Sequence, residues 1–127
     1  MSRWSYPVWK SPGGPPEVWG RNAWGWLHGL AISYPLKPTA ADARLAADLL
    51  KKFFRAIPCP LCHVHIREHV MQFPPELASG QAFQLWVWKF HNAVNRRLRK
   101  PLIDLTEYLL AYDDEIKKAR LSDYSDR

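Results

Sequence analysis

The stretch IPCPLCHVH, residues 57–65, contains both cysteines of the 127-residue chain, Cys59 and Cys62. Pro58 interrupts the helical pattern before it, and Pro60 suits the first turn of a new helix, where a missing N–H costs nothing. Two thiols three residues apart can close into a disulfide and open again, and a helix N-terminus favours their thiolate form. The stretch therefore predicts a junction between two helices that carries a dithiol redox pair.

Three histidines follow the pair, His63, His65 and His69, and they leave a zinc site as the alternative. A structural zinc site needs four ligands and usually draws two of them from a second short motif. The sequence contains no second cysteine pair, so we favour dithiol chemistry and expect no metal. A thioredoxin-like fold is not expected, because no alternating strand and helix patterns flank the pair.

The length of 127 residues allows one hydrophobic core. No apolar run approaches the ~18 residues needed to span a membrane. The segment MSRWSYPVWKSPGGPPEVW, residues 1–19, lacks the continuous apolar region of a secretory signal. We therefore expect the chain to fold in a reducing compartment, the cytoplasm, where structural disulfides are rare.

Hydrophobic periodicity predicts helices on both sides of the junction and no strands. The expected segments span 17–33, 39–57, 59–72, 81–98 and 104–119. Thr39 is the expected N-cap of the second segment, with Asp42 completing a weak form of the capping box. Residues 1–16 form a Pro/Gly/Trp-rich arm, 17–119 the domain and 120–127 a charged tail. The prediction is an all-α fold, a compact helical bundle.

One face of the first helix carries Arg21, Trp24 and His28 at helical spacing. A cation, an indole and an imidazole in one row could hold the phosphate and the flat ring of a nucleotide. The ordinary alternative is a tryptophan in the core with a hydrogen-bonded histidine beside it. Most of the seven tryptophans are expected in the core, and some could offer stacking surfaces to an aromatic ligand.

The fourth helix carries His91 and Asn95 one turn apart, with Asn92 between them. Asparagine and histidine are poor helix formers, and buried amides need partners, so either a ligand or a polar surface accounts for them. The net charge of +6 is partly concentrated in residues 96–100, RRLRK. That run is either a solvated helix end or a phosphate site.

Four motifs in register carry a resemblance to a known family. They are Trp19-Gly20-Arg21-x-x-Trp24-x-x-Leu27-His28, Tyr34-Pro35, Pro58-Cys59-x-x-Cys62-x-x-His65 and His91-Asn92-x-Val94-Asn95-x-x-Leu98-x-Lys100-Pro101. Together, over residues 18–101, they resemble the flavin-dependent sulfhydryl oxidases of the Erv/ALR family. The resemblance implies a four-helix bundle with a short fifth helix that holds FAD non-covalently at the bundle mouth, usually as a homodimer.

The resemblance also implies roles for individual residues. Cys59 and Cys62 become the catalytic pair: a substrate dithiol attacks Cys59, and Cys62 passes two electrons to FAD. Dioxygen then reoxidises the reduced flavin and is itself reduced to hydrogen peroxide. Arg97 lies where a basic residue is common. The implied FAD-binding residues are Arg21, Trp24, His28, Tyr34, His65, His91, Asn92, Val94, Asn95, Leu98 and Lys100.

The chain departs from the family in its cysteines. Many members carry a second, shuttle Cys-x-x-Cys and further cysteines that staple the bundle or the dimer, and this sequence has neither. A protein dithiol substrate or a separate thioredoxin-like partner is therefore expected to reach Cys59. The compact form resembles the sulfhydryl oxidases of large cytoplasmic DNA viruses, which implies a viral protein of the host cytoplasm or the virion.

Two other functions remain open from the sequence. One is a zinc-bound helical module that uses its basic helix end to hold nucleic acid or acidic partners. The other is a helical scaffold whose flavin site is catalytically silent. We favour the oxidase, with no nucleic-acid partner and no membrane span.

Overall fold

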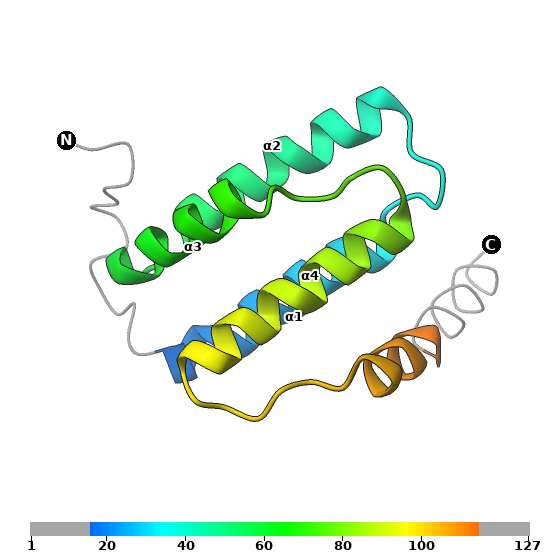
Figure 1. Ribbon diagram of the computed structural model, residues 1–127. Coiled ribbons are helices and arrows are strands. Elements are labelled where there is room, and N and C mark those ends of the chain that lie inside the picture. The colour runs from blue at the N-terminus through cyan, green and yellow to red at the C-terminus, as the bar shows by residue number, and fades with distance from the viewer. Residues whose placement is uncertain (1–15, 115–127) are drawn as a thin grey trace. The chain divides into compact units, whose positions relative to one another are not determined.

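A computed structural model describes residues 16–114 of the chain. These residues form α1 (Pro16–Ser33), α2 (Ala40–Ala56), α3 (Pro60–Gln72) and α4 (Gly80–Arg97), followed by a helical segment over 105–114 (Figure 1). No strand occurs in that range, and the predicted all-α fold is confirmed. The arm and tail expected from the sequence lie outside the described residues, apart from Pro16, which already belongs to α1.

The boundaries of α2 follow the local chemistry that the sequence predicts. The Asp42 N–H donates to Thr39 Oγ1 at 3.1 Å, and the Thr39 N–H donates to Asp42 Oδ2 at 2.8 Å, which completes the capping box. At the other end, the N–H of Ile57 donates to the carbonyl of Phe54 at 3.3 Å. Pro58 then prevents the helix from continuing. The chain is thus free to start α3 two residues later.

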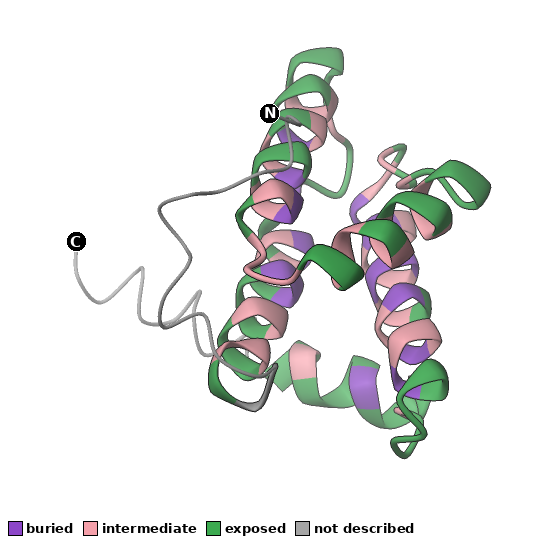
Figure 2. Ribbon diagram, turned by 90° about the vertical axis from the view of Figure 1, so that its left-hand side faces the viewer, coloured by how far each residue is buried: buried purple, intermediate pink, exposed green. Residues whose placement is uncertain are grey.

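The chain divides into two compact units, the first ending at Trp86 and the second beginning at Val87, within α4. In the first unit, α1 and α2 each carry buried apolar residues, whereas α3 carries none (Figure 2). The most deeply buried large side chains of this unit are Leu27, Leu50 and Phe83. Burial of such side chains is the main source of stability for a helical fold.

The tryptophans are less buried than the sequence suggests. Of those in the described range, only Trp86 lies in the core, while Trp26 is 42% exposed and stacks on Phe53 with ring centroids 4.4 Å apart. Trp19, Trp24 and Trp88 are half-buried. The expectation that most tryptophans lie in the core is therefore wrong for this part of the chain. A large amphipathic ring can cover the rim of a small core without entering it.

The start of α4 lies unusually close to the turn after α1. A Cβ added at Gly80 would lie 3.0 Å from the Pro35 carbonyl oxygen and 3.1 Å from that of Tyr34, so only glycine fits without a shift of the backbone. The Tyr34 hydroxyl adds a second tie, donating to the Leu77 carbonyl at 2.8 Å. These contacts fix the end of α1 against the loop that precedes α4.

In the second unit, the segment after α4 is held by side chains of that helix. The carbonyl of Ile103 accepts hydrogen bonds from Trp88 Nε1 and Asn92 Nδ2, both at 2.9 Å. The Ile103 N–H in turn donates to Asn92 Oδ1 at 2.8 Å. One buried amide therefore satisfies both backbone groups of Ile103 and anchors the path to the 105–114 helix. None of the helices in the described range is both long and apolar enough to cross a membrane.

Candidate redox and cofactor site

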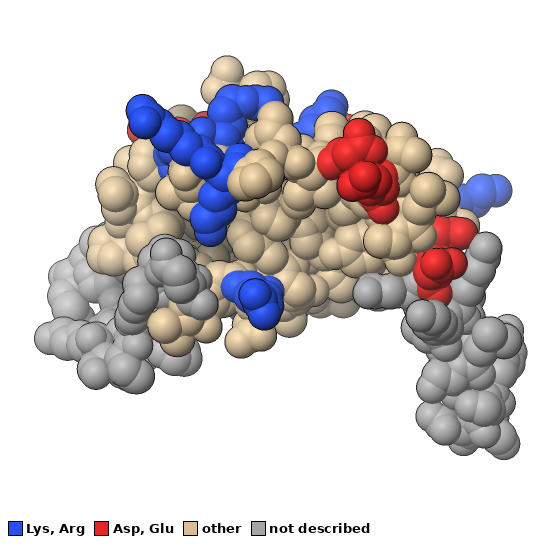
Figure 3. Space-filling view, turned by 90° about the horizontal axis from the view of Figure 1, so that it is seen from below, with Lys and Arg blue, Asp and Glu red and all other residues tan. Residues whose placement is uncertain are grey.

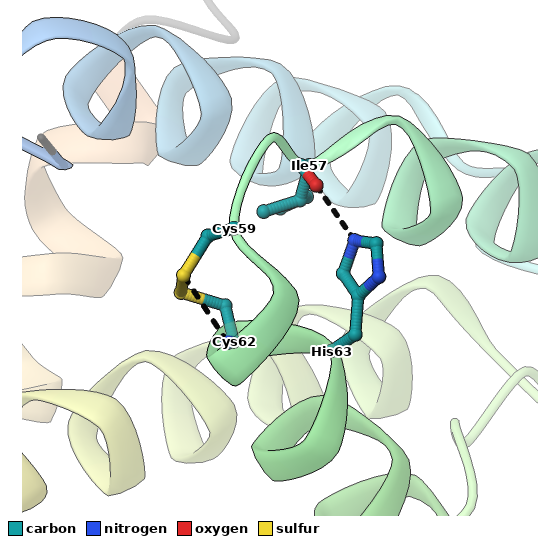
Figure 4. Close-up of a disulfide and its surroundings, with 4 residues drawn as sticks. All are labelled: Ile57, Cys59, Cys62 and His63. Carbon is teal, nitrogen blue, oxygen red and sulfur yellow. Dashed lines mark hydrogen bonds between the residues drawn. A yellow bond between two sulfur atoms is a disulfide. The ribbon is translucent and has the colours of Figure 1, made fainter. Parts of the chain in front are cut away.

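The two cysteines are joined in a disulfide at the N-terminus of α3 (Figure 4). Cys59 is the N-cap, with extended backbone angles of φ −153° and ψ 102°, and Pro60 follows in the first turn. The Cα atoms of Cys59 and Cys62 are 5.2 Å apart, a separation typical of disulfides. The helix junction and the bridged pair that the sequence predicts are both present.

Polar groups around the pair favour negative charge on the Cys59 sulfur. The Cys62 N–H donates to Cys59 Sγ at 3.2 Å, so this sulfur occupies the place of the side-chain oxygen in an ordinary N-cap. A thiolate there would also meet the positive end of the helix dipole. The geometry therefore suits Cys59 to alternate between disulfide and thiolate.

Among the residues that the structure describes, no group of three or more His, Cys, Asp or Glu side chains is placed to hold a metal ion. His65 is half-buried on α3, one turn after Cys62. His63, a candidate ligand only in the zinc alternative, donates from Nε2 to the Ile57 carbonyl at 2.6 Å.

The row on α1 combines an exposed cation with a half-buried indole and a buried imidazole. Arg21 is exposed, Trp24 is half-buried, and the two rings of Trp24 and His28 lie with centroids 6.0 Å apart. His28 is only 4% exposed, and burial lowers its pKa to about 4, so the imidazole is neutral at pH 7. A neutral imidazole beside an indole offers a flat surface and a hydrogen-bonding group without a buried charge. An exposed guanidinium one turn away can meet a phosphate.

Tyr34, a predicted FAD-lining residue, has a clear structural role. The side chain is buried, and its ring contacts that of Phe83 edge-on with centroids 5.3 Å apart. Its hydroxyl donates a hydrogen bond to the Leu77 carbonyl. These contacts place Tyr34 in the packing between the end of α1 and the start of α4. Its contact with FAD stays a prediction.

The polar residues of α4 divide into two kinds. His91 and Val94 are half-buried, whereas Asn92 and Asn95 are each 7% exposed. The Asn92 amide forms hydrogen bonds with the backbone of Ile103, and its Oδ1 also accepts from Asn95 Nδ2 at 3.4 Å. The sequence favours a ligand or a polar surface for these amides, whereas the structure shows them buried and hydrogen-bonded within the chain. The sequence gives no sign that Ile103 is the partner, because that contact depends on how the chain returns after Pro101.

The basic end of α4 is solvent-exposed. Residues 96–100 are all exposed, including Arg97, Leu98 and Lys100, and Lys and Arg side chains are visible at the surface in Figure 3. The structure thus leaves the cations accessible to an anion. The predicted site residues fall in both units: those up to His65 belong to the first, and those from His91 onward to the second.

Comparison with known proteins gives a consistent set of relatives. The model of the Erv1 / Alr family matches residues 21–116. An FAD-linked sulfhydryl oxidase of African swine fever virus is 33% identical over 100 residues, which are 79% of this chain and 84% of that protein. The mitochondrial FAD-linked sulfhydryl oxidase ERV1 of Saccharomyces cerevisiae is 34% identical over 92 residues, 71% of this chain and 49% of that protein.

The similarity extends to three dimensions. The crystal structure of the yeast Erv1 core matches this structure with a TM-score of 0.75 at 30% identity, covering 89% of this chain and 93% of that one. The FAD binding domain of Erv1 from Saccharomyces cerevisiae matches with a TM-score of 0.73 at 31% identity, covering 77% and 93%. On the family match, the sequence identity and the shared fold, this chain belongs to the Erv1/Alr family.

Proposed function

We propose that the chain is an FAD-dependent thiol oxidase that forms disulfides in protein substrates or in a thioredoxin-like relay partner. The observation that carries the proposal is the closed Cys59–Cys62 disulfide at the N-terminus of α3, in a chain with no other cysteine. The family membership supports the same chemistry, since the relatives named above are FAD-linked sulfhydryl oxidases.

The first half of the reaction is thiol–disulfide exchange at Cys59. A substrate thiolate attacks Cys59 Sγ, the bridge breaks, and Cys62 leaves as a thiolate. The second substrate thiolate then attacks the substrate sulfur of this mixed disulfide and expels the Cys59 thiolate. The substrate loses two electrons and becomes a disulfide, and the cysteine pair gains them. The hydrogen bond from the Cys62 N–H to Cys59 Sγ assists the second exchange, because Cys59 is then the leaving thiolate.

The residues that would hold FAD are those that match the family motifs. Trp24 and His28 would face the rings, while Arg21 and Lys100 supply positive charge for the phosphates. The remaining residues of this set are Tyr34, His65, His91, Asn92, Val94, Asn95 and Leu98. When bound, FAD supplies a two-electron acceptor that the reduced pair can use and that dioxygen can reoxidise to give hydrogen peroxide.

We extend the proposal to the biological setting. The domain covers residues 17–119 and acts as a homodimer in the cytoplasm of a cell infected by a large DNA virus, or in the virion. The similarity to an African swine fever virus protein over 84% of its length supports this setting.

Absorbance spectroscopy tests the proposed function. The purified protein should show the oxidised flavin band, and dithiothreitol should bleach it without oxygen and air should restore it. Cys62→Ser should keep the flavin band, lose the bleaching and lose oxygen consumption with a dithiol. A colourless protein that contains stoichiometric zinc would overturn the proposal. Full turnover by Cys62→Ser would overturn the role given to that sulfur.

A further inference from the structure

One backbone oxygen at the α2–α3 junction accepts two hydrogen bonds. The Ile57 carbonyl receives the Cys59 N–H at 2.9 Å and His63 Nε2 at 2.6 Å (Figure 4). A carbonyl oxygen only accepts, so His63 must carry its proton on Nε2. Ile57 is also the C-cap of α2. His63 therefore joins the end of α2 to the first turn of α3, across Cys59.

His63 contributes a side-chain hydrogen bond to the turn between Ile57 and Cys59. The other bonds around Cys59 come from backbone N–H groups: its own to Ile57, that of Cys62 to its sulfur, and that of His63 to its carbonyl at 3.2 Å. While the disulfide is closed, the bridge itself constrains Cys59. Once the bridge opens, these hydrogen bonds still help to hold the N-cap in place.

We propose that His63 is a positioning residue that keeps the Cys59 thiol within closing distance of Cys62 while the disulfide is open. The proposal rests on the proposed function, in which the pair opens and closes in every turnover. Without the His63 bond, the Ile57–Cys59 turn gains conformational freedom, and the effective concentration of one thiol at the other falls. The disulfide then becomes easier to reduce.

Exchange with glutathione measures this effect without flavin turnover. Under anaerobic conditions, two protein thiols react with oxidised glutathione to give the Cys59–Cys62 disulfide and two reduced glutathione molecules. Alkylation and mass spectrometry give the equilibrium constant. His63→Met removes the donor and keeps a good helix former. His63→Gln keeps an N–H donor at a similar distance from the backbone. Glu68→Gln, an exposed change on the same helix, is the control.

We expect His63→Met to lower the closing constant about tenfold, which is a potential about 30 mV less negative. His63→Gln should recover most of this loss, and Glu68→Gln should match the unmodified protein. A wild-type constant in His63→Met would overturn the proposal. So would an equal loss in His63→Met and His63→Gln, because the donor would then not matter.

Nitrogen NMR of the unmodified protein provides a second test that does not depend on the folding of a variant. An Nε2–H tautomer in both redox states supports the positioning role, and an Nδ1–H tautomer in the reduced state overturns it. The outcomes also separate the two proposals. Absence of flavin and oxidase activity would overturn the proposed function, and the closing constant would still report on His63.

Discussion

At the scale of single residues, His28 combines burial with an ionisable side chain. Its imidazole lies beside Trp24, and burial lowers its pKa from 6.5 to about 4. The unfolded chain therefore binds a proton more readily than the folded one between these two values. Such a group contributes stability that is fully present above pH 6.5 and is lost as the pH falls towards 4. His69, whose pKa burial also lowers, acts in the same direction.

Acidification should consequently weaken the fold before most carboxylates titrate. Between pH 7 and pH 5, the His28 contribution to the free energy of unfolding should fall by about 2 kcal/mol. Chemical denaturation of the FAD-saturated protein at several pH values measures this change. The His28→Gln variant, which has no proton to gain in this range, should show a flatter pH dependence. Parallel curves for the two proteins would contradict the assignment to His28.

At the scale of the elements, α4 ends in a Schellman motif that lacks the usual glycine. The Lys100 N–H donates to the Asn95 carbonyl at 2.8 Å, and the Arg99 N–H donates to that of Arg96 at 3.2 Å. Arg99 occupies the left-handed position of this motif, with φ 57°. A residue with a Cβ is strained there, by about 1–2 kcal/mol. The helix end thus keeps a cation where glycine would be more stable.

Arg99→Gly should relieve that strain. We expect the free energy of unfolding to rise by about 1 kcal/mol, a gain reduced by the extra freedom of glycine in the unfolded chain. Arg99→Ala removes the same side chain but keeps the Cβ, and serves as the matched control. Thermal unfolding with saturating FAD compares the two. Equal melting temperatures for the Gly and Ala variants would show that the backbone of Arg99 is not strained.

The elements were largely predictable from local sequence. Prolines and the Thr39 capping box placed the helix boundaries within a residue or two, because these signals act through neighbouring backbone groups. The partners of Tyr34 and Asn92 were not predictable. Both side chains bond to backbone groups of distant segments, Leu77 and Ile103, and no local pattern encodes such a contact. The hydrogen bond from His63 to the Ile57 carbonyl was not predicted either, because histidine spacing gives no sign of a backbone partner.

At the scale of the whole molecule, predicted cofactor residues occur in both units of the chain. The family predicted from four short motifs is confirmed by the comparisons. The prediction was possible because the order and spacing of four motifs are far more specific than any one motif. The individual FAD contacts stay predictions. Sequence spacing can place side chains on one helix face, but it cannot say which faces meet around a ligand.

Removal of FAD should lower the stability of the whole chain. A ligand that binds only the folded state stabilises it according to its concentration, by about 2.7 kcal/mol at one hundred times its Kd. Dialysis to remove FAD, followed by titration back, should therefore raise the melting temperature progressively. Riboflavin is the control, because it has the ring but neither the phosphates nor the adenine. Equal stabilisation by riboflavin would exclude a role for the cations Arg21 and Lys100.

The single disulfide has a consequence for how the protein itself matures. A chain with two cysteines has one possible intramolecular pairing, Cys59 with Cys62, so no mispaired isomers compete with the native one. Within these 127 residues, the bridge needs no isomerase to select its partner. A thiol oxidase built in this way can close its own bridge without help from such a catalyst.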